Sequence, residues 1–427
     1  MTLRLPAVGG DAPFVLEGVR LPGTPGPVDI EVAEGVIAAI RCSAAAAPVR
    51  HIVLPALVDL HTHLREPGNE AAETIATGTR AAAAGGYGAV FAMANTDPVT
   101  DTVARVEELR RRAASASVRV HPVSAATVGL AGSELVDVRG MRAAGVTVFS
   151  DDGHCVDDDG LVFELLTTLA TTGGVFAQHA QSPAIVGEGV INEPVADRIG
   201  CAGWPPAGEE AIVARDIAIA RATGGRLHVC HVSTARTVDL IRWAKSVGAP
   251  VSAEVTPHHL MLTDLDAVHR GTALKVNPPL RSADDVRAVR QGLRDGTIDV
   301  VGTDHAPHPA AAKDRPWGSA SFGMTGIETA LAVVAGVFTD DGGTVDWAGV
   351  ARVMSTRPAE LGGIAAASGH PIGVGAPASL CIVEEGGPWL VDAATQYSKS
   401  RNAAFEGYFL GHRVVFTALE GRVTHSV

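Results

Sequence analysis

The sequence predicts an α/β protein, a (β/α)8 TIM-like barrel with a small β-sandwich domain built from both chain ends. Three observations favour this fold. Eight apolar runs of strand type occupy the middle of the chain, and most are followed by an amphipathic or alanine-rich segment. Short strand-like runs separated by proline and glycine occupy both ends. Polar residues that can carry chemistry follow most of the apolar runs, and in a barrel all of these strand ends open on one face.

The two chain ends are predicted to form one small β domain. Strand-like runs lie at residues 14–21, 28–32 and 36–40, and again at 378–383, 412–417 and 421–423. Neither group has enough strands for a stable sheet of its own, so we expect the two groups to meet. The predicted division is 1–55 for the N-terminal part of the β domain, 56–364 for a metal-dependent barrel, and 365–427 for the C-terminal part.

The middle of the chain alternates between strand-like and helix-like segments, which is typical of parallel β/α units. Segments 209–222 and 234–247 are the clearest helices, and Ser233 or Thr234 can cap the second of them. An open, doubly wound sheet is the alternative, but the count of eight runs and the positions of the polar residues favour the barrel. The runs lie at 53–58, 88–93, 118–123, 146–149, 175–177, 227–230, 251–255 and 298–301.

Composition limits the possible partners and compartments. The 427 residues carry a net charge of −13, which argues against nucleic acid because phosphate binding needs a clustered positive surface. No apolar stretch approaches the length of a membrane span, and residues 1–11 lack a secretory signal pattern. The five cysteines are scattered, as expected for reduced thiols in a cytoplasmic protein. We therefore expect a small-molecule substrate.

The segment Val58–Gly68 is the centre of the predicted site. One residue separates His61 from His63, so on a strand both side chains point to the same side and can bind one metal ion. Arg65 keeps the same parity and adds a forked cation for an anionic group. A bare His-x-His pair is a weak signal by itself, and the acidic and imidazole groups downstream strengthen it.

Polar residues follow five of the later runs. Four histidines and two carboxylates at one mouth suit a pair of divalent ions, with zinc favoured and manganese or iron as alternatives. Two ions that share a water lie roughly 3.5–4 Å apart, and that water becomes a nucleophilic hydroxide near neutral pH. One carboxylate is needed to bridge the ions and another to move protons. The residues are Asn95, Asp151, Asp152, His179, His231 and Asp304.

Eight motifs together resemble those of the dihydroorotases, a family of the amidohydrolase superfamily, and they span most of the predicted barrel. The resemblance implies a metal-dependent barrel with a split β domain. It also implies the reversible cyclisation of N-carbamoyl-L-aspartate to L-dihydroorotate in de novo pyrimidine (UMP) biosynthesis. The motifs lie at 59–68, 93–96, 149–153, 231–234, 254–260, 275–281, 302–308 and 322–328.

The same resemblance implies roles for individual residues and a cofactor of two Zn²⁺ per subunit. Asp304 is the expected general acid and base, acting with a metal-bridged hydroxide. The implied metal ligands are His61, His63 and Asp304 for the first ion, His179 and His231 for the second, and Asp152 between them. The implied substrate contacts are His63, Arg65, Asn95, Asn277, His308, Phe322 and Gly323, with Arg65, Asn95 and His308 clamping the substrate carboxylate.

The bridging position separates this chain from many relatives in the superfamily, which use a carboxylated lysine there. No lysine follows the fourth run, only Asp151 and Asp152. Adjacent residues on a strand face opposite ways, so only one of the two can enter the site. Matching to the branch with an aspartate bridge favours Asp152, which leaves Asp151 to cap the turn or support a ligand. After His179 the chain has Ala180-Gln181-Ser182, where relatives commonly carry Cys-Glu-Asp to support the ring.

Two alternatives to this function remain open. A hydantoinase-like or allantoinase-like cyclic amidase fits the same barrel, although its neutral substrate needs no carboxylate clamp such as Arg65. The other alternative is a non-catalytic barrel that scaffolds aspartate carbamoyltransferase. The presence of every expected metal ligand argues against it. We expect a homo-oligomer, namely a dimer. Association with aspartate carbamoyltransferase in addition to catalysis remains open.

Overall fold

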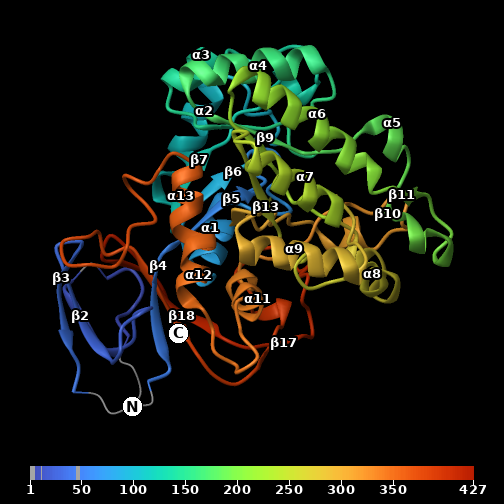
Figure 1. Ribbon diagram of the computed structural model, residues 1–427. Coiled ribbons are helices and arrows are strands. Elements are labelled where there is room, and N and C mark those ends of the chain that lie inside the picture. Colours follow the sequence, from blue (N-terminus) through green and yellow to red (C-terminus); the bar gives the residue numbers. More distant parts are fainter. Residues whose placement is uncertain (1–4, 11, 45–48) are drawn as a thin grey trace.

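The computed structural model describes residues 5–10, 12–44 and 49–427. Residues 1–4 and 11, from the segment without a secretory signal pattern, and residues 45–48 lie outside the described residues. A barrel of parallel strands surrounded by helices makes up most of the molecule, and a small β domain lies beside it (Figure 1). The predicted fold class is therefore confirmed.

Eight parallel strands form the barrel in chain order. The first three and the last five make two hydrogen-bonded groups, and single bridges, Ser124 to Phe149 and Thr62 to His305, join them at both seams. The ring of strands is closed, so the open-sheet alternative is wrong. The strands are β5 (Leu57–Thr62), β6 (Tyr87–Ala92), β7 (Arg119–Pro122), β8 (Val148–Phe149), β9 (Val175–Gln178), β12 (Leu227–Val229), β13 (Val251–Val255) and β14 (Val300–Val301).

The first predicted run, 53–58, is wrong as a single barrel strand. The chain divides it between β4 (His51–Pro55), which belongs to the β domain, and β5 of the barrel. The backbone changes partner within two residues, because the amide of Ala56 donates to Ser379 and that of Leu57 donates to Gly86. Both strands are buried on both faces, so the run is apolar throughout and periodicity gives no sign of the change. The domain limits 1–55, 56–364 and 365–427 stay a prediction.

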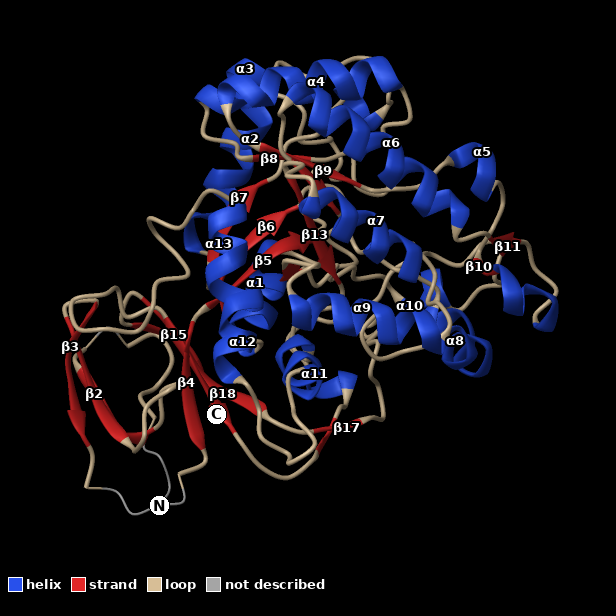
Figure 2. Cartoon of the chain, viewed as in Figure 1, coloured by secondary structure: helices blue, strands red, loops and turns tan. Residues whose placement is uncertain are grey.

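Helices cover the outside of the barrel (Figure 2). The two clearest predictions are confirmed by α6 (Ala207–Thr223) and α7 (Ala235–Ser246), and the Thr234 side chain caps α7 by accepting from the Thr237 amide. The other helices are α1 (Ile75–Ala84), α2 (Val103–Arg112), α3 (Val138–Ala143), α4 (Asp159–Thr172), α5 (Pro183–Val186), α8 (Asp264–Arg270), α9 (Ala283–Asp295), α10 (Ala310–Lys313), α11 (Ala330–Val337), α12 (Trp347–Ala351) and α13 (Arg357–Leu361). Among the described helices none has the length and apolar character needed to cross a membrane.

The small domain is a sandwich of two antiparallel sheets. One sheet has the order β1-β2-β3 and the other β19-β18-β15-β4, so strands from both chain ends pair directly. Apolar side chains from both sheets, among them Leu16, Ile30, Leu380 and Phe416, form its core. Its strands are β1 (Phe14–Val19), β2 (Val28–Ala33), β3 (Val36–Cys42), β4, β15 (Leu380–Glu384), β18 (Arg413–Leu419) and β19 (Arg422–Ser426).

The interior of the barrel changes from apolar to polar along its axis. Side chains such as Leu60, Phe91 and Val148 fill one part together with Leu361 at the end of α13. Buried polar groups, among them His61, occupy the part toward the carboxyl ends of the strands. This arrangement leaves the chemistry on the face where barrel strands end.

Candidate metal and substrate site

One cavity at the carboxyl ends of the barrel strands gathers the predicted site residues. It holds about 570 Å³ of empty space, including the open solvent at its mouth. Each residue predicted to bind metal or substrate lines it except His61, which has no exposed surface. The lining residues are His63, Arg65, Asn95, Asp152, Gly153, His179, His231, Asn277, Asp304, Ala306, His308, Phe322 and Gly323.

Asp152 lies between two pairs of imidazole rings. Its Oδ2 is 3.3 Å from Nε2 of His61 and 3.3 Å from Nε2 of His63. Its Oδ1 is 3.3 Å from Nδ1 of His179 and 3.3 Å from Nε2 of His231. The last two ring nitrogens are 2.9 Å apart. Each oxygen of one carboxylate thus faces its own pair of nitrogens, which is the arrangement that a bridging ligand between two ions requires.

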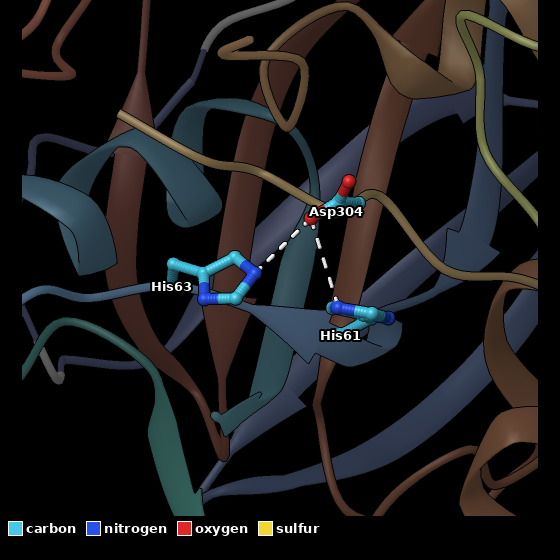
Figure 3. Close-up of side chains that lie close together, drawn as sticks. All are labelled: His61, His63 and Asp304. Carbon is cyan, nitrogen blue, oxygen red and sulfur yellow. Dashed lines mark hydrogen bonds and ion pairs between the residues drawn. The ribbon is translucent and has the colours of Figure 1, made fainter. Parts of the chain in front are cut away.

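Asp304, which follows the last barrel strand in the sequence, lies beside the His61 and His63 rings. Its Oδ1 is 3.1 Å from Nε2 of His63 and 3.6 Å from Nε2 of His61 (Figure 3). The two histidines come from the end of β5, and Asp304 follows β14, the strand beside it across the seam. Asp304 and His231 have φ angles of 44° and 34°, and such left-handed backbone is unfavourable for residues other than glycine.

Acceptors on the far side of three rings direct the inward nitrogens. Nδ1 of His61 lies 2.5 Å from Glu254 Oε1, and Nδ1 of His63 lies 2.9 Å from Asn95 Oδ1. Nε2 of His179 lies 2.9 Å from Oε1 of Gln181. Each outward nitrogen can donate to its acceptor, so the inward nitrogen presents a lone pair to the cavity once the ring is neutral. Within the described part of the chain the inward Nε2 of His61 is buried and has no hydrogen-bond partner. These nitrogen and carboxylate donors fit divalent ions such as zinc.

Electrostatics keep the two carboxylates ionised. Burial alone would raise the pKa of Asp152, but the His61 ring and hydrogen bonds with His179 and His231 lower it well below its usual value. Burial would also raise the pKa of Asp304, but a hydrogen bond from His63 lowers it, and the net pKa lies below its usual value. In turn Asp152 and Glu254 outweigh burial and raise the pKa of His61. A metal ion must therefore displace a proton from this cluster as it binds.

Asp151 points away from the ring pairs. Its Oδ1 accepts hydrogen bonds from the amides of Ala126 (2.8 Å) and Thr127 (2.9 Å), and its Oδ2 accepts from the Thr127 hydroxyl. The structure therefore places Asp152 at the rings and gives Asp151 to the neighbouring loop.

The predicted substrate contacts line the same cavity. Nη2 of Arg65 is 3.3 Å from Nε2 of His308, which is itself 2.6 Å from the Phe322 carbonyl oxygen. Burial, then the Arg65 charge, lowers the pKa of His308 to about 3, so that ring is neutral and Arg65 supplies the fixed cation. Asn277 donates to Oε1 of Gln181 at 3.0 Å, and its own Oδ1 is buried without a partner among the described residues.

Two supporting residues received no role from the sequence. Gln181 takes the place of the missing Cys-Glu-Asp support, because its one oxygen accepts from both His179 and Asn277. Glu254 lies behind His61, and its Oε2 is 3.2 Å from Nε2 of His228. A carboxylate within the fully buried strand β13 was the available signal for Glu254, since such groups are almost never buried unpaired.

The sequence and the fold also resemble those of known proteins. A family model described as "Dihydro-orotase-like" matches residues 50–237. The chain is similar to the dihydroorotase of Streptomyces coelicolor (50% identity, 87% of this chain and 88% of the relative). It is also similar to that of Leifsonia xyli (47%, 97% and 96%). Among solved structures, L-hydantoinase (dihydropyrimidinase) from Arthrobacter aurescens shares 27% identity with a TM-score of 0.83, each chain being covered to 96%.

Proposed function

The chain belongs to the dihydroorotase family, and on that premise we propose that it is a zinc-dependent dihydroorotase. The proposed reaction is the reversible cyclisation of N-carbamoyl-L-aspartate to L-dihydroorotate in pyrimidine biosynthesis. The observation that carries the proposal is the position of the Asp152 carboxylate, with one oxygen toward His61 and His63 and the other toward His179 and His231.

Two Zn²⁺ ions are the proposed cofactor. His61, His63 and Asp304 would hold one ion, His179 and His231 the other, and Asp152 both. Bound ions supply an activated water at neutral pH and polarise the ring carbonyl. The imidazole and carboxylate donor set and the unpartnered Nε2 of His61 support this assignment.

Asp304 is the proposed general base and acid. In the hydrolytic direction its carboxylate takes a proton from the attacking water as the carbon–oxygen bond forms. It then delivers that proton to the ring nitrogen as the carbon–nitrogen bond breaks, and cyclisation runs the same steps in reverse. Its place on the cavity wall, with Oδ1 3.1 Å from Nε2 of His63, supports this role.

Arg65, Asn95 and His308 are the proposed clamp on the substrate carboxylate. Arg65 brings a permanent planar cation, and the neutral His308 ring beside it adds a second polar contact. His63, Asn277, Phe322 and Gly323 complete the proposed substrate contacts. The free Oδ1 of Asn277 can accept a ring N–H.

A hydantoinase-like amidase is the second candidate, favoured by the likeness to the Arthrobacter structure. A neutral cyclic substrate would leave the half-buried Arg65 cation without an anionic partner, which argues against it. Assays of the purified, zinc-loaded enzyme with dihydroorotate, hydantoin and allantoin separate the two candidates. Turnover of either rival substrate faster than dihydroorotate would overturn the proposal.

Assembly and compartment are further proposals. We propose a homodimer, and association with aspartate carbamoyltransferase stays open. Light scattering of the enzyme alone and mixed with that protein tests both. All five cysteines are free, which supports a reducing, cytoplasmic compartment. Enzyme that carries no metal and stays inactive after zinc is added would support a scaffold instead.

A further inference from the structure

Two buried lysines lie behind the wall of the cavity and have no part in the proposed reaction. The chain has four lysines, and Lys275 and Lys313 are only 2% and 4% exposed. Lysine is almost never fully buried unless its charge is satisfied. These two must therefore be compensated by their surroundings.

The Lys313 ammonium is held by three carbonyl oxygens. Its Nζ lies 2.9 Å from the oxygen of Lys275, 3.0 Å from that of Ser321 and 2.9 Å from that of Gly323. An ammonium group has three hydrogens and no acceptor, so each hydrogen has one partner. The side chain thereby joins the segment that leads to Asn277 with the segment that carries Phe322 and Gly323.

Lys275 holds the same segment from the other side. Its Nζ donates to the carbonyl oxygens of Trp317 and Ala320, and it lies 4.0 Å from the centre of the Phe322 ring. Its own backbone oxygen accepts from the Gly323 amide at 2.9 Å. The side chains of the two lysines thus both bind backbone carbonyl groups of the segment 313–323.

The clamped segment forms part of the cavity wall. Phe322 and Gly323 line the cavity, and the Phe322 oxygen accepts from Nε2 of His308, which lies beside Arg65. Gly323 has a φ of 127°, and a Cβ there would lie 2.7 Å from Cβ of Ala306, so the wall is packed closely against its neighbour. A shift of the segment would move three proposed substrate contacts together.

We propose that Lys313 and Lys275 are positioning residues that hold the Phe322–Gly323 wall against Asn277 and His308 and so set the affinity of the cavity for substrate. The inference rests on the proposed function, since dihydroorotate is the ligand whose binding the wall would govern. The lysines act through the backbone they hold and touch neither the substrate nor the metal ligands.

The protonation of Lys313 adds a consequence. Burial, then the charge of Lys275, lowers the pKa of Lys313 to about 7. The other titratable groups that face it, His308 and His258, both have lowered pKa values, about 3 and about 4, and are neutral near pH 7. A neutral amine has two hydrogens for three carbonyl oxygens. The clamp therefore loses one hydrogen bond as pH rises through about 7.

The test uses the full-length, zinc-loaded enzyme with Lys313→Met and Lys275→Met. We expect the KM for dihydroorotate to rise about tenfold or more, with a smaller change in kcat and unchanged zinc content. Lys245→Met is the matched control, because its Nζ bonds the Gly296 oxygen and Asp299 away from the cavity. An unchanged KM in both variants would overturn the proposal.

A second measurement needs no substitution. Hydrogen exchange of the wild-type amides in 314–323, corrected for intrinsic rates, should show lower protection at pH 8 than at pH 6, and Lys313→Met should remove the difference. Equal protection at both pH values would contradict the clamp even if the variants failed to fold. Absence of dihydroorotate turnover in the wild type, by contrast, would refute the proposed function and leave the exchange result to judge the clamp.

Discussion

Oε1 of Glu254 lies 2.5 Å from Nδ1 of His61, on the side of the ring that faces away from the cavity. A Cβ at position 302 would collide with the same carboxylate, so Gly302 provides the room for it. The contact makes Nδ1 the donor in the neutral ring and turns Nε2 toward Asp152.

Glu254→Gln should weaken zinc binding about 10- to 100-fold, because the ring loses its charged partner. Competition with a chromophoric chelator measures the affinity. Asp216→Asn is the control, since Asp216 is equally buried but bonds Gln178 and Arg215. An equal loss in the control would assign the effect to general packing.

Asp152→Asn should remove both zinc ions, because the amide offers only one oxygen to the two ring pairs. The neighbouring Asp151→Asn should keep both ions and lower only the Tm, since Asp151 serves the 126–127 loop. Zinc analysis beside thermal melts tests the pair. Loss of zinc from the Asp151 variant alone would reverse the assignment.

Asp304→Asn should lower kcat by about 10²- to 10⁴-fold while zinc stays bound, because the amide cannot move the proton. Single-turnover kinetics and zinc content are measured on the same sample. Zinc loss would mean that Asp304 acts chiefly as a ligand.

Arg65→Lys should raise the KM for dihydroorotate about 10- to 100-fold with a smaller change in kcat, because a point charge cannot replace a planar fork. Arg111→Lys on the exposed surface of α2 is the control. Unchanged KM in the Arg65 variant would exclude the carboxylate clamp.

Glu328→Gln should raise the Tm at pH 8 by about 2–4 °C and raise it much less at pH 5. Burial raises the pKa of Glu328 from 4.5 to about 7. The unfolded chain therefore binds fewer protons between these values, and stability falls as pH rises through them.

Glu73→Gln is the opposite control for Glu328. Burial would raise the pKa of Glu73, but hydrogen bonds from His305 and Ser398 and the His305 charge lower it. Its ionised form stabilises the fold, so the variant should lower the Tm at pH 8. Shifts of the same sign in both variants would refute the linkage argument.

Strand parity and position carried most of the site prediction. The alternation of side chains placed His61 and His63 on one side, and both Nε2 atoms indeed face Asp152. The same rule left Asp151 and Asp152 undecided, because parity separates the two residues without saying which faces inward. In the structure, the amides of residues 126 and 127 bind the Asp151 carboxylate, so Asp152 is the residue that faces inward.

Long-range partners explain what the sequence could not reveal. The role of Glu254 depends on His61, 193 residues away. Gln181 departs from the common motif and still supplies an acceptor for His179. Within the apolar run 53–58 the backbone partner changes from Ser379 to Gly86. The sequence does not reveal this change, because strands buried on both faces lack an alternation of apolar and polar residues.

The barrel closes where Thr62 pairs with His305. His63 and Asp304 meet at that seam although 241 positions separate them along the chain. A nascent polypeptide therefore has no complete centre until its eighth strand has left the ribosome and docked on the first. Metal uptake would thus report that the barrel has closed, and truncation ahead of residue 304 removes both the closure and the proposed proton carrier.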